Sequence, residues 1–280
     1  MTNRKNVSIY KVLVLIVCVI LAFLSLLPYI VMIVNSTRST NQIQQHAISF
    51  IPSKYFINNI RILTGKAFNP AVGFMNSFLL SAGTTVVTLY FSTLTAYALV
   101  MYEWKAKKFF FSFIMAVMMI PATITVIGFY QMVYKMGLAN KLITLILPAI
   151  ASPSMVFFMR QYMKPSVSPS LVESARIDGS KEFFTFNVIV LPIMKPALAT
   201  QAIFTFVTSW NELFRPLILL TKKAKYTLPI MVSLLRGDIY KREHGAIYVG
   251  LTLTALPLIV VYFILSKYIV AGVAMGSVKG

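Results

Sequence analysis

Six long apolar runs restrict the folds that this chain can adopt. Each run has at least 18 residues and few charges, which is the length that a helix needs to cross the hydrocarbon core of a bilayer. Because a backbone in lipid must satisfy its own hydrogen bonds, such runs predict helices. The sequence therefore predicts an all-α integral membrane protein with six transmembrane helices, at residues 12–34, 73–101, 110–134, 142–159, 193–220 and 246–266.

The composition argues against other classes of protein. Of the 280 residues, 58% are hydrophobic and 12% are charged, whereas about 25% of the residues of soluble proteins are charged. The net charge of +19 does not indicate nucleic-acid binding, because the basic residues lie between the apolar runs, where anionic lipid head groups attract them. With Cys18 as the single cysteine and two distant histidines, we expect neither a disulfide within the chain nor a metal site.

The first apolar run is too long for a cleaved signal peptide. It has 23 residues, whereas the apolar core of a signal peptide has about 7–15. We therefore expect an N-terminal segment at 1–11, a transmembrane domain at 12–266 and a tail at 267–280. The second span is rich in serine and threonine, which favours close helix packing, with a role in substrate binding as the alternative.

The charge pattern alone leaves the sidedness of the chain open. Six spans place both termini on one side, and cytoplasmic loops normally carry an excess of lysine and arginine. With the N-terminus inside, 13 of the 26 lysines and arginines fall on the cytoplasmic side. The short basic segments at 1–11 and 103–108 favour cytoplasmic termini, because short loops count most.

A polar segment at 160–192 separates the fourth and fifth runs. Ser168 followed by Pro169 is typical of a helix start, and Gly179 suits the left-handed residue that follows a helix end. A second short helix is expected to end before Pro192. The segment thus predicts a helix–turn–helix, called the knuckle below (residues 168–192), whose exposed corner lies near 176–179.

The knuckle carries a recognisable pattern. Glu173-Ser174-Ala175, Gly179, Ile189 and Leu191-Pro192 resemble the Glu-Ala-Ala loop of the inner-membrane permease subunits of ABC importers, with Ser174 in place of the first alanine. Other segments resemble the carbohydrate-uptake branch of this family, which includes the smaller membrane subunit of maltose transporters. These segments are Asn76-Ser77, Ala96-Tyr97-Ala98, Trp210-Asn211-Glu212, Tyr226-Thr227-Leu228-Pro229 and residues 276–280.

The resemblance implies a coupling role for the knuckle. It would enter a cleft of a cytoplasmic ATPase subunit, with Glu173 and Asp178 facing basic groups and Gly179 forming the sharp turn. The tail residues would reach toward the same ATPase pair; they are Gly276, Ser277, Lys279 and Gly280. This arrangement places residues 160–192 and both termini in the cytoplasm, and the chain in the cytoplasmic membrane of a bacterium.

The source of energy is expected to lie in another chain. No Gly-x4-Gly-Lys-Ser/Thr phosphate loop occurs in the sequence, so we expect no cofactor here, no enzymatic activity, and ATP and Mg²⁺ on partner ATPases. The resemblance implies a second permease subunit, two cytoplasmic ATPase subunits and an extracytoplasmic sugar-binding protein. Transport would proceed by alternating access coupled to ATP hydrolysis.

Five residues are candidates for the substrate path. A charge within a span costs about 2.5–3.5 kcal/mol and normally faces protein or water, so Glu212 and Arg215 could line the path or form a structural ion pair. Trp210 could stack on a sugar or anchor the helix at the interface. Asn211 and Gln131 could bind sugar hydroxyls or join neighbouring helices.

The loop at 222–243 and the nature of the cargo complete the expectations. With Leu234-Leu235 between charges, the loop resembles a segment that probes the cleft of the receptor.

We expect neutral oligosaccharides as cargo, with acidic saccharides or glycerol-phosphate esters as an alternative that would use Arg215. An ATP-independent carrier or channel is a different possibility, but carriers often show inverted repeats, and none is evident.

Overall fold

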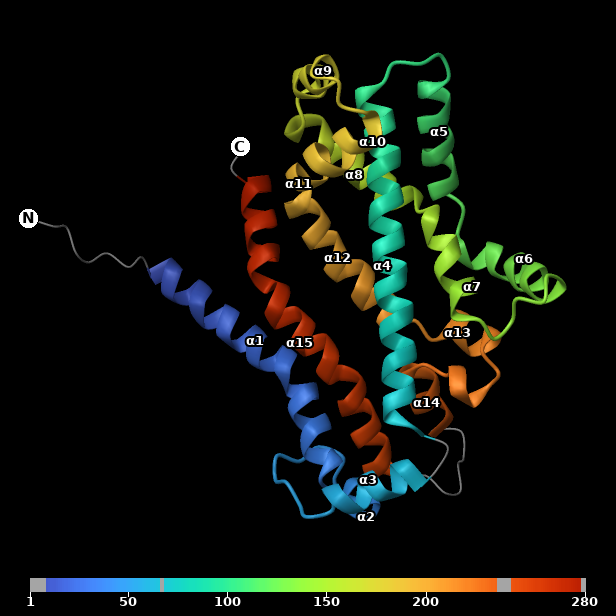
Figure 1. Ribbon diagram of the computed structural model, residues 1–280. Helices are drawn as coiled ribbons and strands as arrows, with labels where there is room; N and C mark the ends of the chain where they lie inside the picture. Colours follow the sequence, from blue (N-terminus) through green and yellow to red (C-terminus); the bar gives the residue numbers. More distant parts are fainter. Residues whose placement is uncertain (1–8, 66–67, 236–242, 278–280) are drawn as a thin grey trace, which may run out of the picture. The chain divides into compact units, whose positions relative to one another are not determined.

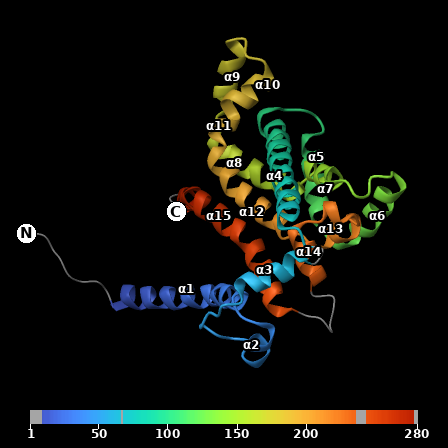
Figure 2. The ribbon, with the colours of Figure 1, turned by 60° about the horizontal axis from the view of Figure 1, so that its bottom comes forward.

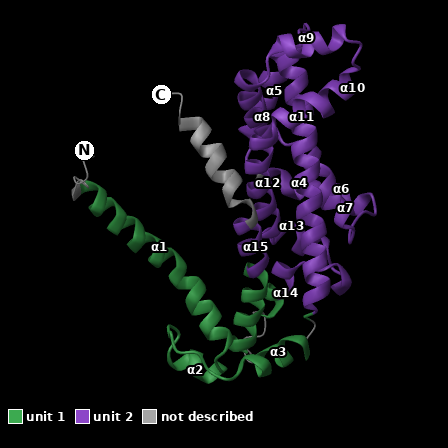
Figure 3. Cartoon of the chain, turned by 60° about the vertical axis from the view of Figure 1, so that its left-hand side comes forward, with its two compact units in different colours: residues 1–68, 232–255 green, residues 69–231, 256–280 purple. Residues whose placement is uncertain are grey.

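All regular secondary structure in the residues that the structure describes is helical. The structure is a computed structural model that describes residues 9–65, 68–235 and 243–277, without side chains for 9, 122–123 and 264–277. Every regular element within these ranges is a helix (Figure 1), which confirms the predicted all-α class. The chain forms two compact units, unit 1 with residues 1–68 and 232–255 and unit 2 with residues 69–231 and 256–280 (Figure 3).

The helices are distributed over the two units as follows. Unit 1 contains α1 (Ile9–Ser36), α2 (Thr40–Gln45) and α3 (Phe56–Gly65). Unit 2 contains α4 (Pro70–Met101), α5 (Lys107–Met118), α6 (Ala122–Lys135), α7 (Leu142–Ile146), η1 (Leu147–Ile150), α8 (Pro153–Ser166), α9 (Pro169–Ile177), α10 (Glu182–Phe184), η2 (Thr185–Val190), α11 (Leu191–Ile193), α12 (Lys195–Trp210), α13 (Phe214–Leu219) and η3 (Lys223–Lys225). Two helices have residues in both units, α14 (Leu228–Leu235) and α15 (His244–Ser277).

In unit 1, Arg38 organises the polar turn that follows α1. Its guanidinium donates from Nη1 to the side-chain oxygen of Asn35 and the carbonyl of His46, and from Nη2 to the carbonyl of Gln42, each at 2.8 Å. Ser39 begins α2 with a reciprocal capping box that involves Gln42. Because Arg38 is only 6% exposed, these bonds are what makes its burial tolerable.

The first turn of α15 packs tightly against the same region of unit 1. The Asn59 amide donates to the carbonyls of Ser36 and Arg38, both at 2.9 Å. A Cβ atom at Gly245 would overlap the Asn59 side chain and would lie 2.6 Å from the Arg38 carbonyl oxygen. Only glycine therefore allows the two segments to approach so closely.

In unit 2, α4 runs between two buried clusters. The N-terminal half of α4 packs with residues of α6, α7, α13 and α14, in a cluster of Leu80, Tyr130, Val133, Leu145, Leu219, Leu220 and Ile230. The C-terminal half packs with α8, α9, η2 and α12, in a cluster that contains Tyr97, Met159, Val172, Phe186 and Met194. Ser77, Ser81, Ser92 and Thr93 of α4 are also buried, as expected for a helix that packs closely with its neighbours.

The membrane helices differ in part from the predicted spans. By length and composition, three described helical segments can cross a membrane: Tyr10–Ser36, Pro70–Met101 and His244–Phe263. Two more segments qualify only as bent pairs, Leu142–Ile150 with Pro153–Ser166 (44°) and Glu182–Ile193 with Lys195–Asn211 (79°). The predicted span at 110–134 is divided into α5 and α6, and the one at 193–220 into α12 and α13.

Prolines explain several of these differences, because they lack the N–H group that a regular helix needs. Pro121 precedes α6, while Pro148 and Pro153 flank the bend before α8. The prediction that the second knuckle helix ends before Pro192 is wrong, since the helix continues to Ile193. It does so through the π-helix η2, in which the N–H of Leu191 bonds to the carbonyl of Phe186, and this wider turn accommodates the proline.

The contact at Gly245 generates a test of the packing of unit 1. We expect Gly245→Ala to destabilise the protein by about 1–3 kcal/mol, because the new methyl group meets a backbone carbonyl that cannot move away. The thermal unfolding midpoint of the purified permease measures this loss. Gly128→Ala is the matched control, since nothing lies within 4 Å of its Cβ position; equal midpoints for the two variants would contradict the packing described here.

Candidate functional site: the knuckle and a polar cavity

The knuckle presents one face of α9 and buries the other. Ser168 is the N-cap residue of α9 and Pro169 lies in its first turn, as predicted. Val172 and Ala175 are buried, with exposed fractions of 1% and 7%. Val172 belongs to the cluster that contains Phe186 and Met194. Because these two residues are three apart and share a helix face, the intervening Glu173 and Ser174 are exposed.

The turn after α9 has the geometry that its sequence predicts. Gly179 has a φ of +80°, in the left-handed region that residues with a side chain rarely adopt. The N–H of Ser180 bonds to the carbonyl of Ala175 at 2.9 Å, and the N–H of Gly179 bonds to the carbonyl of Arg176 at 3.0 Å. This pair of bonds is a Schellman motif, which ends α9 and reverses the chain. Asp178 and Ile177 are left exposed at the corner.

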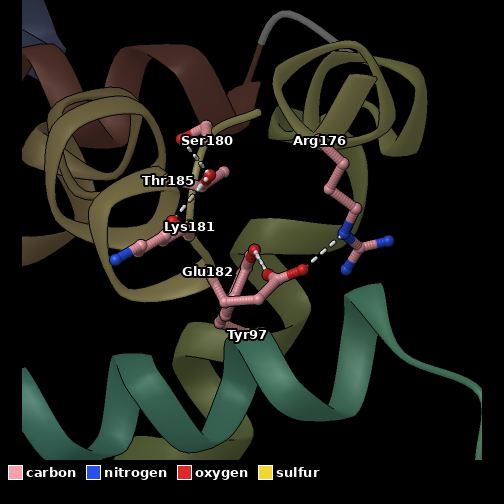
Figure 4. A network of polar contacts seen from close by, with 6 residues as sticks. All are labelled: Tyr97, Arg176, Ser180, Lys181, Glu182 and Thr185. Atoms are coloured by element: carbon pink, nitrogen blue, oxygen red, sulfur yellow. Dashed lines mark hydrogen bonds and ion pairs between the residues drawn. The ribbon is translucent and has the colours of Figure 1, made fainter. Parts of the chain in front are cut away.

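A polar network connects the knuckle to the end of α4 (Figure 4). Arg176 Nε donates to Glu182 Oε1 at 2.5 Å, and the Tyr97 hydroxyl donates to Glu182 Oε2 at 3.0 Å. The Arg176 guanidinium also lies 4.9 Å from the ring centroid of Tyr102, within the range of a cation–π contact. Glu182 therefore links α9, α10 and α4 through its two carboxylate oxygens.

The charge state of Glu182 follows from these partners. Glu182 is the first residue of α10 and lies in the polar segment before α12. The hydrogen bond from Arg176 lowers the pKa of the Glu182 carboxyl below its ordinary value, against the opposing effect of desolvation. The carboxylate is consequently ionised at neutral pH and available as an acceptor for both neighbours.

The last part of the motif forms the stem of the knuckle. Ile189 and Leu191 are half-buried, and Leu191 packs on the cluster that contains Phe186 and Val190. Pro192 is exposed. Figures 1 and 2 show α9 and α10 side by side at one end of unit 2. The structure thus brings Glu173, Ser174, Asp178 and Gly179 to one corner, and places Ile189, Leu191 and Pro192 behind it.

A polar cavity of 410 Å³ lies beside α4 and α12 in unit 2. Two of the five predicted path residues, Glu212 and Arg215, line it. Arg215 Nη2 donates to Glu212 Oε2 at 2.9 Å, across the break between α12 and α13. The same pair borders a second cavity of 760 Å³ next to Val126, Ile127 and Phe129 of α6.

The other three predicted path residues do not line these cavities. Trp210 is 1% exposed and packs against Phe206 and Phe74, with ring centroids 5.6 and 5.7 Å apart. Its ring is therefore part of the packing of α12 on α4. Asn211 and Gln131 are exposed but belong to neither cavity lining.

Sequence reasoning missed most of the cavity lining. Thr84 and Thr88 of α4 and Gln201, Thr205 and Thr208 of α12 line the cavity. Their spacings of four, and of four and three, place each set on one face of its helix. This polar periodicity within two apolar runs was the signal that could have found them.

Two other predicted sites fall partly on described residues. The predicted loop at 222–243 contains η3 and α14, in which Leu234 is 52% exposed and Leu235 is half-buried; residues 236–242 lie outside the described ranges. The predicted tail is helical as far as Ser277, so Gly276 and Ser277 belong to α15, and Lys279 and Gly280 lie outside the described ranges. Among described residues, no group of three His, Cys, Asp or Glu side chains could hold a metal ion.

Comparisons with known proteins place the chain in a family. Residues 88–275 match the model of the family "Binding-protein-dependent transport system inner membrane component". The arabinooligosaccharides transport system permease protein AraQ of Halalkalibacterium halodurans is 33% identical over 280 residues, which cover 99% of this chain and 100% of AraQ. The lactose transport system permease protein LacG of Rhizobium radiobacter is 31% identical over 258 residues, 92% of each chain.

A solved structure shares the fold. The chain matches the crystal structure of a bacterial ABC transporter involved in the import of the acidic polysaccharide alginate, with a TM-score of 0.81 over 95% of this chain and 99% of that one. The two sequences are 23% identical. Together with the family match, this confirms the predicted resemblance to an inner-membrane transport subunit that is not itself an enzyme. The chain belongs to the family of inner membrane components of binding-protein-dependent transport systems.

Proposed function

We propose that this chain is one of two permease subunits of an ABC importer that takes up oligosaccharides by alternating access. The names of its relatives support a saccharide as cargo, since AraQ is named for arabinooligosaccharides and LacG for lactose. The proposal includes six membrane crossings, cytoplasmic termini and a cytoplasmic knuckle. ATP and Mg²⁺ bind to two partner ATPases, and an extracytoplasmic sugar-binding protein delivers the cargo.

The exposed corner of the knuckle is the observation that carries this proposal. Glu173 and Asp178 are exposed, and Ile177 between them is 86% exposed. An exposed apolar side chain flanked by carboxylates suits a protein contact with an apolar centre and a charged rim. We infer that this corner enters a cleft of the ATPase, with Glu173 and Asp178 facing basic groups there.

The network behind the corner supports a path for the coupling motion. Glu182 bonds to Arg176 of the knuckle and to Tyr97 of α4. The same helix α4 carries Thr84 and Thr88 at the cavity. A displacement of the knuckle by the ATPase is thereby transmitted along one continuous helix to the substrate path, through contacts that are all direct.

The chemistry of the cavity favours a neutral sugar over an acidic one. Hydroxyl and amide groups of Thr88, Gln201 and Thr205 line it, and these groups can both donate to and accept from sugar hydroxyls. Arg215 is already neutralised by Glu212, so it offers no free positive charge for an anionic cargo.

The half-exposed Leu234 of α14 is the residue that we assign to the receptor-facing segment.

Charge reversal at Glu173 tests the contact with the ATPase. We expect Glu173→Lys to reduce receptor-stimulated ATP hydrolysis of the assembled importer roughly tenfold or more, because a like charge at an interface costs several kcal/mol. Glu173→Gln should have a smaller effect. Gln161→Lys, which introduces a lysine at an exposed site of α8, is the control; unchanged hydrolysis and assembly in Glu173→Lys would refute the contact.

The left-handed turn at Gly179 provides a second test. Gly179→Val should strain the turn by about 1–2 kcal/mol, whereas Gly179→Asn should be tolerated because asparagine adopts this conformation more readily. Faster tryptic cleavage after Lys181, together with weaker ATPase stimulation, should therefore be seen for valine and not for asparagine. Equal behaviour of the two variants would show that the shape of the corner does not matter.

The ion pair at the cavity distinguishes the two classes of cargo. Arg215→Gln and Glu212→Gln each leave one charge without its partner, so each should lower the uptake of a neutral arabinooligosaccharide. The double variant should recover much of that uptake, because no uncompensated charge is left. Lys222→Gln, at an exposed position nearby, is the control. Specific uptake of an oligouronate by the wild type, lost in both Arg215→Gln variants, would instead assign acidic saccharides as the cargo.

A further inference from the structure

A basic cavity of 650 Å³ lies where α4 ends and α5 begins. It is separate from the knuckle and from the two cavities at Glu212. Its lining includes Lys105, Lys107, Lys108 and Arg160, one carboxylate (Glu103), and the aromatic residues Trp104 and Phe111. Four cationic side chains from a short loop, α5 and α8 thus converge on one hollow within unit 2.

Most of the positive charge at this cavity has no carboxylate partner among the described residues. Lys107 forms an ion pair with Glu103 at 2.6 Å, whereas Lys105, Lys108 and Arg160 form none with described side chains. The Arg160 guanidinium lies 3.9 Å from the ring centroid of Phe111, and its buried Nε has no hydrogen-bond acceptor in the described part of the chain. The cavity therefore offers donors and positive charge that suit an anion.

The surroundings indicate an anion that carries an apolar tail. Phe109, Phe110 and Phe113 of α5 are 70%, 52% and 57% exposed. Trp104 packs edge-on against Phe110, with ring centroids 5.4 Å apart, and tryptophan is enriched where membrane meets water. A free phosphate would use only the charges, whereas a phospholipid would also cover the aromatic side chains.

We propose that this cavity binds the phosphate of an anionic phospholipid at the cytoplasmic surface of the membrane. The proposal rests on the sidedness given above for the permease. Arg160 lies on α8, which leads directly into the knuckle, and Leu99 of the lining lies on α4. A bound head group would therefore join the C-terminal end of α4 to the middle of α8, the helix that leads into the knuckle.

Retention of lipid by the purified importer tests this site. The complete complex is placed in nanodiscs of phosphatidylcholine with or without phosphatidylglycerol, and the phosphatidylglycerol that it retains is measured by native mass spectrometry. We expect Lys105→Gln/Lys108→Gln to lower the affinity for this lipid roughly 25-fold, since each of the two basic residues near an anionic surface contributes about fivefold. Both lysines are exposed, so the double variant is not expected to affect folding. Arg160→Gln, checked for intact assembly, should lower the affinity about fivefold.

The controls separate the lipid from other ligands. Lys164→Gln removes an exposed lysine one turn further along α8 that does not line the cavity, and it should retain the lipid like the wild type. Equal retention by all variants, or displacement of the lipid by millimolar inorganic phosphate, would overturn the proposal. Loss of the ATPase subunits without loss of lipid would show that the cavity contacts protein instead. Because lipid retention is measured without sugar, a negative result would contradict the lipid site and would not contradict the proposed transport function.

Discussion

The proposed transmission of motion from the knuckle to α4 depends on the hydrogen bond between Tyr97 and Glu182. Tyr97 is 3% exposed, and its ring packs 5.4 Å from that of Phe186 while its hydroxyl donates to the carboxylate. A hydrogen bond to a charged group contributes about 1.5–3 kcal/mol, and the ring contact adds to it. Glu182 also binds Arg176, and Phe186 belongs to η2, so α10 and η2 together cannot be displaced from α4 without breaking both the polar and the aromatic contact.

Because α4 is long and continuous, the contact at Tyr97 is connected to residues of the same helix at the cavity. Tyr97 lies nine positions after Thr88, which corresponds to about 14 Å along a helix axis. Over this distance α4 shows no break, in contrast to the bent segments around it. Its buried serine and threonine side chains allow neighbouring helices to pack closely. A straight helix in contact with bent ones is a suitable lever, because the bends can absorb a movement that the straight helix transmits.

The sequence predicted those features that depend on local chemistry. The apolar runs identified α1, α4 and α15, and the glycine at position 179 identified the left-handed turn, because both follow from residue type and spacing alone. The role of Trp210 could not be predicted from residue type and spacing. Its chemical type suited a sugar-stacking role as well as packing, and its burial depends on Phe74, far away in the sequence. The predicted 110–134 span is divided at Pro121, which precedes α6; hydropathy alone does not record this break, because it ignores the missing N–H group of proline.

The chain has few acidic residues, so each unpaired carboxylate has a large effect on the local charge of the surface. The chain has seven aspartates and glutamates against 26 lysines and arginines. Glu103, Glu182 and Glu212 are taken up by ion pairs, whereas Glu173 and Asp178 have no cationic partner among the described residues and project from the knuckle. In a protein of such positive charge, two exposed carboxylates beside an exposed isoleucine form a local patch of opposite sign. On the proposal that the knuckle contacts a partner ATPase, we infer that a basic cleft there would be attracted to this corner, and this attraction would orient the encounter before any apolar contact forms.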